Sequence, residues 1–249
     1  MNWVDDGIFL GGRKFGESSS IISVLTRENG RHLGLVHGGT GKRLRPVLQV
    51  GNIVRCEWNA RLEENLGKLR LEMLQPLAAC VLEQPLPLSG MGSVCGLVEQ
   101  LLPERDRCTS LFEQTKDLLE SFVSGQNYMA KYVCWELDLL AELGFGLNLD
   151  SCVVTGVKND LPWVSPKSGC AVSRQAGDKY AKNLLMLPTF LINGSSATTS
   201  EISSGLKLTG HFLSKAANIN GVELSSARDR FVDQFSRGVY GPKVKTDNE

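Results

Sequence analysis

Hydrophobic residues follow two different periods along the chain, and the change falls near Pro76. Before it, short runs rich in β-branched, aliphatic and aromatic residues predict half-buried strands. The runs lie at residues 8–10, 21–26, 31–36, 53–58 and 69–74. Asn29-Gly30 predicts a tight turn between the second and third strands, because both residues readily adopt positive φ. Five short strands in this length favour a small barrel such as the OB-fold, with an SH3-like barrel as the alternative.

Beyond Pro85 and Pro87, apolar residues recur at spacings of three and four, which places them on one face of a helix. The pattern predicts helices over about 94–102, 111–122, 128–143, 199–217 and 225–235. The third ends at Gly144, since glycine readily forms a left-handed C-cap. Between 152 and 170 the period breaks into a loop with proline and glycine, where Val153-Val154 and Ala171-Val172 are expected to close a hairpin.

These periods predict an α+β chain built from two domains and a tail. Residues 1–76 are expected to form a five-stranded OB-fold barrel. Residues 77–240 are expected to form an all-helical domain that carries a small β-hairpin insert, resembling a zinc finger but free of metal, over about 150–173. Residues 241–249 are expected to be a flexible tail.

Charge is divided unevenly, although the 27 basic and 27 acidic residues cancel over the whole chain. Residues 11–55 hold eight Lys or Arg against two Glu, a net charge of +6. Residues 81–150 hold four basic and eleven acidic residues, a net charge of −7. A basic beginning joined to an acidic middle indicates a polyanion-binding part and a part with another role.

Composition argues against several cellular contexts. No apolar run approaches the roughly 18 residues that a membrane helix needs, and the first residues lack the features of a secretory signal. We therefore expect a cytoplasmic protein that does not attach to membranes. The seven cysteines form no C-x-x-C pair, which favours free, mostly buried thiols over a disulfide framework or a zinc site. No cofactor is expected.

Motifs for catalysis are missing or poorly placed. The segment 37–43 lacks the spacing and the hydroxyl of a phosphate-binding loop. Acidic side chains cluster only at 5–6, at 63–64 and in the helical set Glu136, Asp138 and Glu142. Neighbouring acids point to different faces of a strand or helix, so we interpret them as solvated surface. Three histidines and no G-x-S-x-G motif leave no nucleophile–base pair, and we assign no catalytic residue.

The glycine-rich basic loop over 38–45 is the strongest candidate site. Its cations and backbone N–H groups could reach the phosphates of a nucleic acid, and other bases extend the surface on neighbouring strands. The predicted DNA-binding residues are Arg13, Lys14, Arg27, Arg31, Lys42, Arg43 and Arg45. Phe15 and Trp58 are candidates for stacking on bases, with a place in the core as the alternative for Trp58.

Several segments, in the same order along the chain, resemble the RecO family. They lie at 13–19, 26–31, 48–51, 86–90, 135–146 and 164–169, and the fifth reads WELDLLAELGFG. The resemblance implies an OB-fold followed by a helical domain with an inserted hairpin. It implies a DNA repair protein that binds single- and double-stranded DNA and anneals complementary strands. With RecR, such proteins help to load RecA onto DNA coated by the single-strand-binding protein SSB, whose acidic C-terminal tail docks on the helical domain in some members.

The resemblance also implies a four-cysteine zinc site in the insert of some members, and this chain departs from that pattern. Cys152 and Cys170 stand alone where paired cysteines are needed. The DNA-binding role carries over to the seven cations that charge density already singles out. Two alternatives stay open: an OB-fold protein that binds RNA in translation, and a metal-dependent nuclease that uses Asp5, Asp6 or the Glu136 set.

Overall fold

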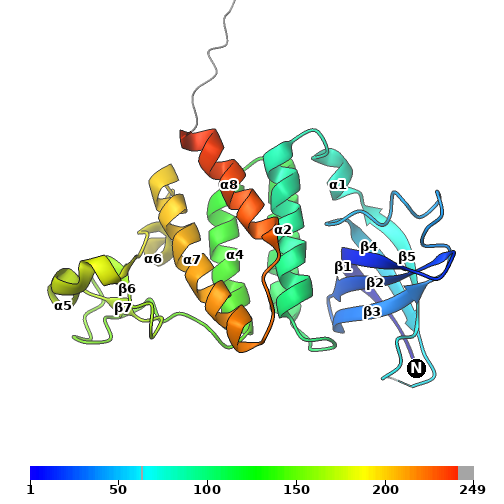
Figure 1. Ribbon diagram of the computed structural model, residues 1–249, viewed down its shortest axis with the longest axis horizontal. Helices are drawn as coiled ribbons and strands as arrows, with labels where there is room; N and C mark the ends of the chain where they lie inside the picture. Colours follow the sequence, from blue (N-terminus) through cyan, green and yellow to red (C-terminus); the bar gives the residue numbers. More distant parts are fainter. Residues whose placement is uncertain (63, 241–249) are drawn as a thin grey trace, which may run out of the picture.

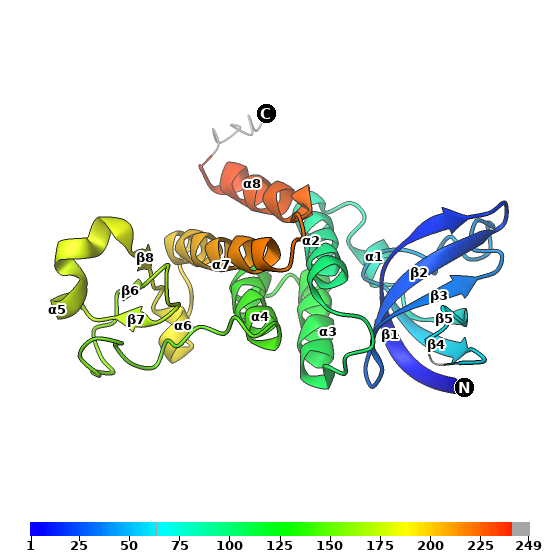
Figure 2. The same cartoon turned by 60° about the horizontal axis from the view of Figure 1, so that its bottom comes forward.

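The computed structural model describes residues 1–62 and 64–240, so the tail expected over 241–249 lies outside the described residues. Three parts lie in a row along the molecule. Figures 1 and 2 show a barrel at one end, a group of helices in the middle, and a small sheet with short helices at the other end. The fold class is α+β, as the two hydrophobic periods predict.

The barrel contains all five predicted strands. These are β1 (Asn2–Phe15), β2 (Ser19–Thr26), β3 (Gly30–Val36), β4 (Ile53–Asn59) and β5 (Lys68–Gln75). They close in the order β1-β2-β3-β5-β4, and of the two barrels that the sequence left open this one is the OB-fold.

β1 is much longer than the hydrophobic run that predicts it, because it pairs with two neighbours. Residues 2–8 pair with β4, and residues 7–15 pair with β2. A strand that pairs with both neighbours must bend, and it must approach β2 closely. Gly12 permits that approach, since a Cβ atom there would lie 2.6 Å from Cδ1 of Ile22.

Both faces of β1 are buried at its centre. Phe9 points into the barrel core, which it shares with Trp58 and others. Ile8 and Leu10 point the other way and join the core of the helices. Double burial explains why residues 8–10 form a continuous apolar run instead of the alternation of a half-buried strand.

The predicted helices are confirmed, with shifted ends. They are α2 (Pro85–Leu101), α3 (Thr109–Ser124), α4 (Tyr128–Glu142), α7 (Thr199–Ile219) and α8 (Ser226–Tyr240). α2 begins nine residues earlier than the apolar spacing indicated, because proline is tolerated in the first turn of a helix. The short helices α1 (Leu77–Cys80) and α6 (Phe190–Asn193) contain too few residues to show a period.

The insert differs in part from the expected hairpin. β6 (Trp163–Val164), β7 (Ala171–Val172) and β8 (Leu185–Met186) form a sheet in the order β7-β6-β8, with α5 (Arg174–Gly177) and the 3₁₀ helix η1 (Asp178–Asn183) beside it. The strand at Ala171-Val172 is confirmed, but the one at Val153-Val154 is wrong. These valines are exposed in a turn that the Gly156 N–H closes by donating to the Cys152 carbonyl.

The turn between β2 and β3 packs against the segment between α2 and α3. Gly30 has φ of +66°, as the Asn-Gly pair predicts, whereas Asn29 does not adopt a positive φ. A Cβ on Gly30 would lie 2.0 Å from the Asp106 carbonyl oxygen. The Arg105 N–H donates to the Arg31 carbonyl at 2.7 Å. Glycine is therefore needed for the turn and also for the close contact. None of the helices in the described residues has the length and hydropathy to cross a membrane.

Candidate nucleic-acid interface

Five of the seven predicted cations lie at one end of the barrel, which we call the basic end. Arg13 and Lys14 lie on β1 beside the turn into β2, and Lys42, Arg43 and Arg45 lie in the β3–β4 loop (residues 37–52). All five side chains are exposed. In the part of the chain that the structure describes, no acidic side chain makes an ion pair with them. Their charge is therefore available to an external anion.

Hydrogen bonds hold the β3–β4 loop against the β1–β2 turn. Ser19 Oγ lies 3.3 Å from His37 Nδ1, and the Thr40 hydroxyl donates to the Glu17 carbonyl at 3.5 Å. Gly39 lies so close to Ser20 that a Cβ atom there would be 2.8 Å from the serine Cβ. These contacts join two segments that are distant in sequence into one surface. No sequence motif marked Ser19, His37 or Thr40 for this role.

The β3–β4 loop is shaped by turns and anchored by apolar side chains. The Gly41 N–H donates to the Gly38 carbonyl at 2.8 Å, and Gly38 has the positive φ of +72° that glycine favours. Leu44, Val47 and Leu48 pack against the barrel core. Lys42, Arg43 and Arg45 therefore project from a loop whose backbone is held close to the barrel.

Arg27 and Arg31 do not belong to this surface, contrary to the expectation that they extend it. Arg31 pairs with Leu25, five residues along β2 from Ser20, which is roughly 17 Å at about 3.4 Å per residue. The Arg31 side chain is only 13% exposed, donates to the Leu102 carbonyl at 2.8 Å and lies 3.5 Å from Glu104. Arg27 lies 2.7 Å from Glu113 on α3. Acidic residues of the helical region neutralise both, so we leave them out of the interface.

Trp58 is a core residue rather than a stacking platform. It is 1% exposed, and its indole N–H donates to the Leu66 carbonyl at 3.0 Å. Its ring stacks on Trp3 with centroids 5.7 Å apart, and His32 meets both rings edge-on. Of the two stacking candidates, Phe15 alone is presented to solvent, at 51% exposure.

His32 gives the barrel a pH-dependent stability. It is 3% exposed, and burial, followed by repulsion from Arg105, lowers its pKa from 6.5 to about 4. Between these two values the unfolded chain binds more protons at this position, so stability rises with pH. The contribution is complete above pH 6.5 and falls by about 3 kcal/mol as the pH reaches 4.

We therefore expect the intact protein to lose about 2–3 kcal/mol of unfolding free energy between pH 7.5 and 4.5 through His32. The measurement is urea unfolding at both values, in parallel with His32→Gln, whose loss should be smaller by that amount. An NMR titration of the imidazole checks the cause directly. Equal losses in the two proteins, or a His32 pKa near 6.5, would contradict the prediction.

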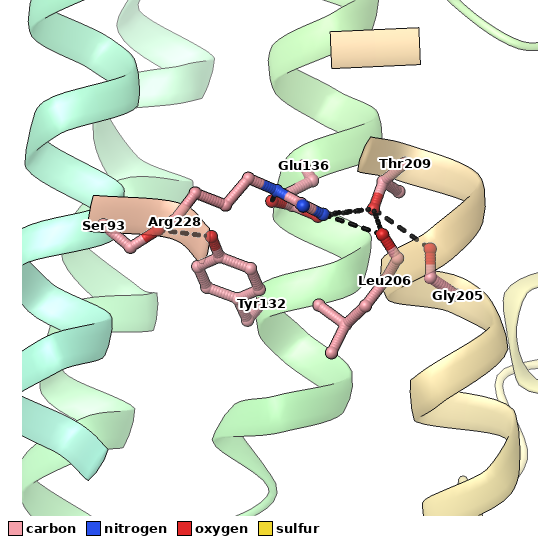
Figure 3. Close-up of polar contacts among 7 residues, drawn as sticks. All are labelled: Ser93, Tyr132, Glu136, Gly205, Leu206, Thr209 and Arg228. Atoms are coloured by element: carbon pink, nitrogen blue, oxygen red, sulfur yellow. Dashed lines mark hydrogen bonds and ion pairs between the residues drawn. The ribbon is translucent and has the colours of Figure 1, made fainter. Parts of the chain in front are cut away.

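The interpretation of Glu136 as solvated surface is wrong. Glu136 is 0% exposed and accepts two hydrogen bonds from Arg228, at 2.6 and 2.9 Å, as well as one from the Thr209 hydroxyl (Figure 3). Its place in the sequence carried a hint, because it lies four residues from both Tyr132 and Leu140 and thus on their buried face. Burial lowers the pKa of Arg228, but the Glu136 carboxylate outweighs this and raises it.

The other acidic candidates do not assemble a metal site. Asp5 is buried and accepts from the Glu28 N–H and the Asn29 side chain, both at 2.8 Å, and Asp6 lies 3.2 Å from Arg55. Glu63 lies outside the described residues. Among the described residues, no three His, Cys, Asp or Glu side chains are arranged to hold a metal ion.

The insert does not fit the zinc ion found in some members of the family that the sequence resembles. Cys152 is 2% exposed and lies beside the hydroxyls of Ser173 and Thr155, whereas Cys170 is partly buried. Burial raises the pKa of Cys152, but hydrogen bonds from Ser173 and Thr155 lower it to about 6. Two cysteines cannot supply the four ligands of a structural zinc site.

Known proteins match the chain over nearly its whole length. The family described as "Recombination protein O N terminal" matches residues 1–77, and "Recombination protein O C terminal" matches residues 82–218. The "DNA repair protein RecO" of Rhodospirillum centenum is 45% identical over 240 residues, which cover 95% of this chain and 96% of the relative. The proteins of that name from Bradyrhizobium diazoefficiens and Xanthobacter autotrophicus are 44% and 40% identical, over 95% and 96% of this chain and 96% and 99% of the relatives. The chain therefore belongs to the RecO family.

Proposed function

We propose that the protein is a non-catalytic DNA-binding recombination mediator that acts in DNA repair. The observation that carries this proposal is the basic end, where the β1–β2 turn and the β3–β4 loop are held together and expose five cations that pair with no acid among the described residues. Such a surface recognises the phosphates of single- and double-stranded DNA without reading their sequence. Family membership supports the same role, since the relatives are named DNA repair proteins.

Strand annealing follows from charge neutralisation alone. Two complementary strands repel each other through their phosphates, although base pairing between them is favourable. A protein that neutralises phosphates lowers this repulsion and releases counterions, so it needs no nucleophile, metal or bound nucleotide. The proposed interface offers cations and backbone N–H groups, which are sufficient for this purpose.

We assign different roles to the two proposed domains, residues 1–76 and 77–240. The barrel binds DNA, and the net-acidic helical domain binds protein partners. These partners are RecR and the C-terminal tail of SSB. Together with RecR, the protein helps to load RecA onto DNA strands that SSB coats. The protein works in the cytoplasm, at the nucleoid. The charge of −7 over residues 81–150 supports this division, because it disfavours DNA contact there.

The proposal is tested by strand annealing with labelled complementary oligonucleotides, bare or coated with SSB, with and without RecR. We expect the protein to accelerate annealing and to bind single strands with an affinity that falls as salt rises. The logarithmic salt slope should approach about 3.5 if all five cations contact phosphate, at about 0.7 for each contact.

Three results would overturn the proposal. One is an annealing rate that the protein does not change at low salt. Another is preferential binding of RNA when DNA and RNA of one sequence compete, which would favour a role in translation. The third is cleavage of labelled DNA in the presence of magnesium or manganese, which would indicate a nuclease.

A further inference from the structure

An exposed phenylalanine stands within the basic end. Phe15 is the last residue of β1 and is 51% exposed. Among the Phe, Tyr and Trp side chains that the structure describes, only Tyr180, in the insert at 62%, is also more than half exposed. Phe15 belongs to neither hydrophobic core. Its ring therefore contributes little to folding and is free to contact a ligand.

The surroundings of Phe15 are open and contain two cations, Arg13 and Lys14, with one acid, Glu17, in the turn that follows. Arg13 and Lys14 precede Phe15 on β1, and Arg13 lies on the same side of the strand because side chains alternate. Phe15 pairs with Ser19, whose hydroxyl contacts His37 at the start of the β3–β4 loop. Next to it, Gly16 has no atom beyond its two chain neighbours within 4 Å of the position of a Cβ. Half of the Phe15 side chain is therefore open to a ligand.

The combination of cations and an aromatic ring selects one kind of polyanion. A single strand offers phosphates together with unstacked bases, whose faces stack on aromatic side chains. A duplex offers the phosphates but keeps its bases stacked on one another. An acidic peptide offers charge without a planar π face at each repeat.

We propose that Phe15 stacks on a base of single-stranded DNA and so gives the basic end a preference for single strands. This rests on the proposed function, because the neighbouring cations hold the phosphates while the ring contacts the base. The preference suits an annealing protein, which must hold a strand before pairing and release the duplex afterwards.

The test measures the affinity of the full chain for three probes of equal length: an oligothymidine, the same oligomer with abasic positions, and a blunt duplex. Phe15→Ala is expected to weaken binding to oligothymidine by about 5- to 100-fold. Binding to the abasic oligomer and to the duplex should stay within about twofold of the parent, with the salt slope unchanged. Phe15→Trp should restore the affinity for oligothymidine, and Phe15→Leu should not, because leucine is apolar but has no π face.

Tyr180→Ala is the matched control, because it removes the other strongly exposed aromatic side chain, which lies on η1 of the insert. The insert lies at the opposite end of the molecule from the barrel (Figure 1). This control should leave all three affinities unchanged. The inference fails if Phe15→Ala binds oligothymidine as the parent does, if it loses affinity equally for all three probes, or if Tyr180→Ala causes the same loss. Failure of the proposed function looks different, since the parent protein would then bind none of the probes with a salt-dependent affinity.

Discussion

Replacing Glu136 by glutamine is expected to lower the free energy of unfolding by about 3–5 kcal/mol. The substitution keeps the size of the side chain but removes its charge. Arg228, a residue that is only 8% exposed, then has no counter-ion. The pair links α4 to α8, and Thr209 adds a contact from α7 (Figure 3). Arg228 also donates to the Leu206 carbonyl at 2.8 Å, so the guanidinium cannot turn to solvent without breaking a bond to α7.

Urea unfolding followed by circular dichroism measures the effect, with Glu142→Gln as the control. Glu142 lies on the same helix and is exposed, so its change should stay within about 0.5 kcal/mol. The double variant Glu136→Leu with Arg228→Met should recover most of the loss, because a buried ion pair is often no more stabilising than apolar side chains of similar size. Equal stability of Glu136→Gln and Glu142→Gln would show that Arg228 is compensated in some other way.

The barrel could be predicted from the sequence because its determinants are local. Each of the five strands has its own hydrophobic run, and Asn29-Gly30 specifies the turn between two of them. The length of β1 could not be predicted in the same way. Neither of its outer parts contains a continuous apolar run. The first alternates exposed residues with the half-buried Trp3 and the buried Asp5, the last is exposed, and both are strand because β4 and β2 supply partners.

The errors at charged positions concern residues whose partners are distant in sequence. Glu136 and Arg228 are separated by 92 positions, and Arg31 and Leu102 by 71. Charge counting treats every such side chain as solvated, because it has no information on which elements pack together. A carboxylate at the spacing of buried residues, as at Glu136, is the one local feature that indicates a buried partner.

The basic end could be predicted in composition but not in extent. The loop cations stand out as a local run with glycines, and the structure exposes them as expected. The charge pattern of the sequence already groups Arg13 and Lys14 with the loop. The contacts of Ser19, His37 and Thr40, which no sequence pattern indicates, join the two segments in the structure. Other tertiary contacts, to Glu113, to Glu104 and to the Leu102 carbonyl, assign Arg27 and Arg31 to the junction with the helices.

Changing Lys42, Arg43 and Arg45 together to glutamate is expected to weaken binding to any DNA sequence by at least about 100-fold near 0.1 M salt. Three lost phosphate contacts on a single strand lower the logarithmic salt slope by about two. From about 1 M down to about 0.1 M salt, the affinity of the parent therefore rises about 100-fold more than that of the variant. Annealing should fall with binding. The corresponding alanine variant should show the reduced slope without the repulsion between glutamate and phosphate. Both variants should remain folded, because substitutions in an exposed loop usually shift the free energy of unfolding by less than about 0.5 kcal/mol.

The matched control changes Lys158, Lys179 and Lys182 to glutamate, which alters the net charge equally on exposed residues of the insert. That variant should bind with nearly the parent's slope, because contacts rather than total charge set the slope. If both variants lose affinity alike, the loop acts only through overall charge. If the loop variant stays folded and keeps the slope of the parent, the loop does not contact phosphate. The interface would then have to be centred on Arg13 and Lys14. Replacing these two residues by glutamate would then have to abolish binding, or the basic end would not be the DNA-binding surface.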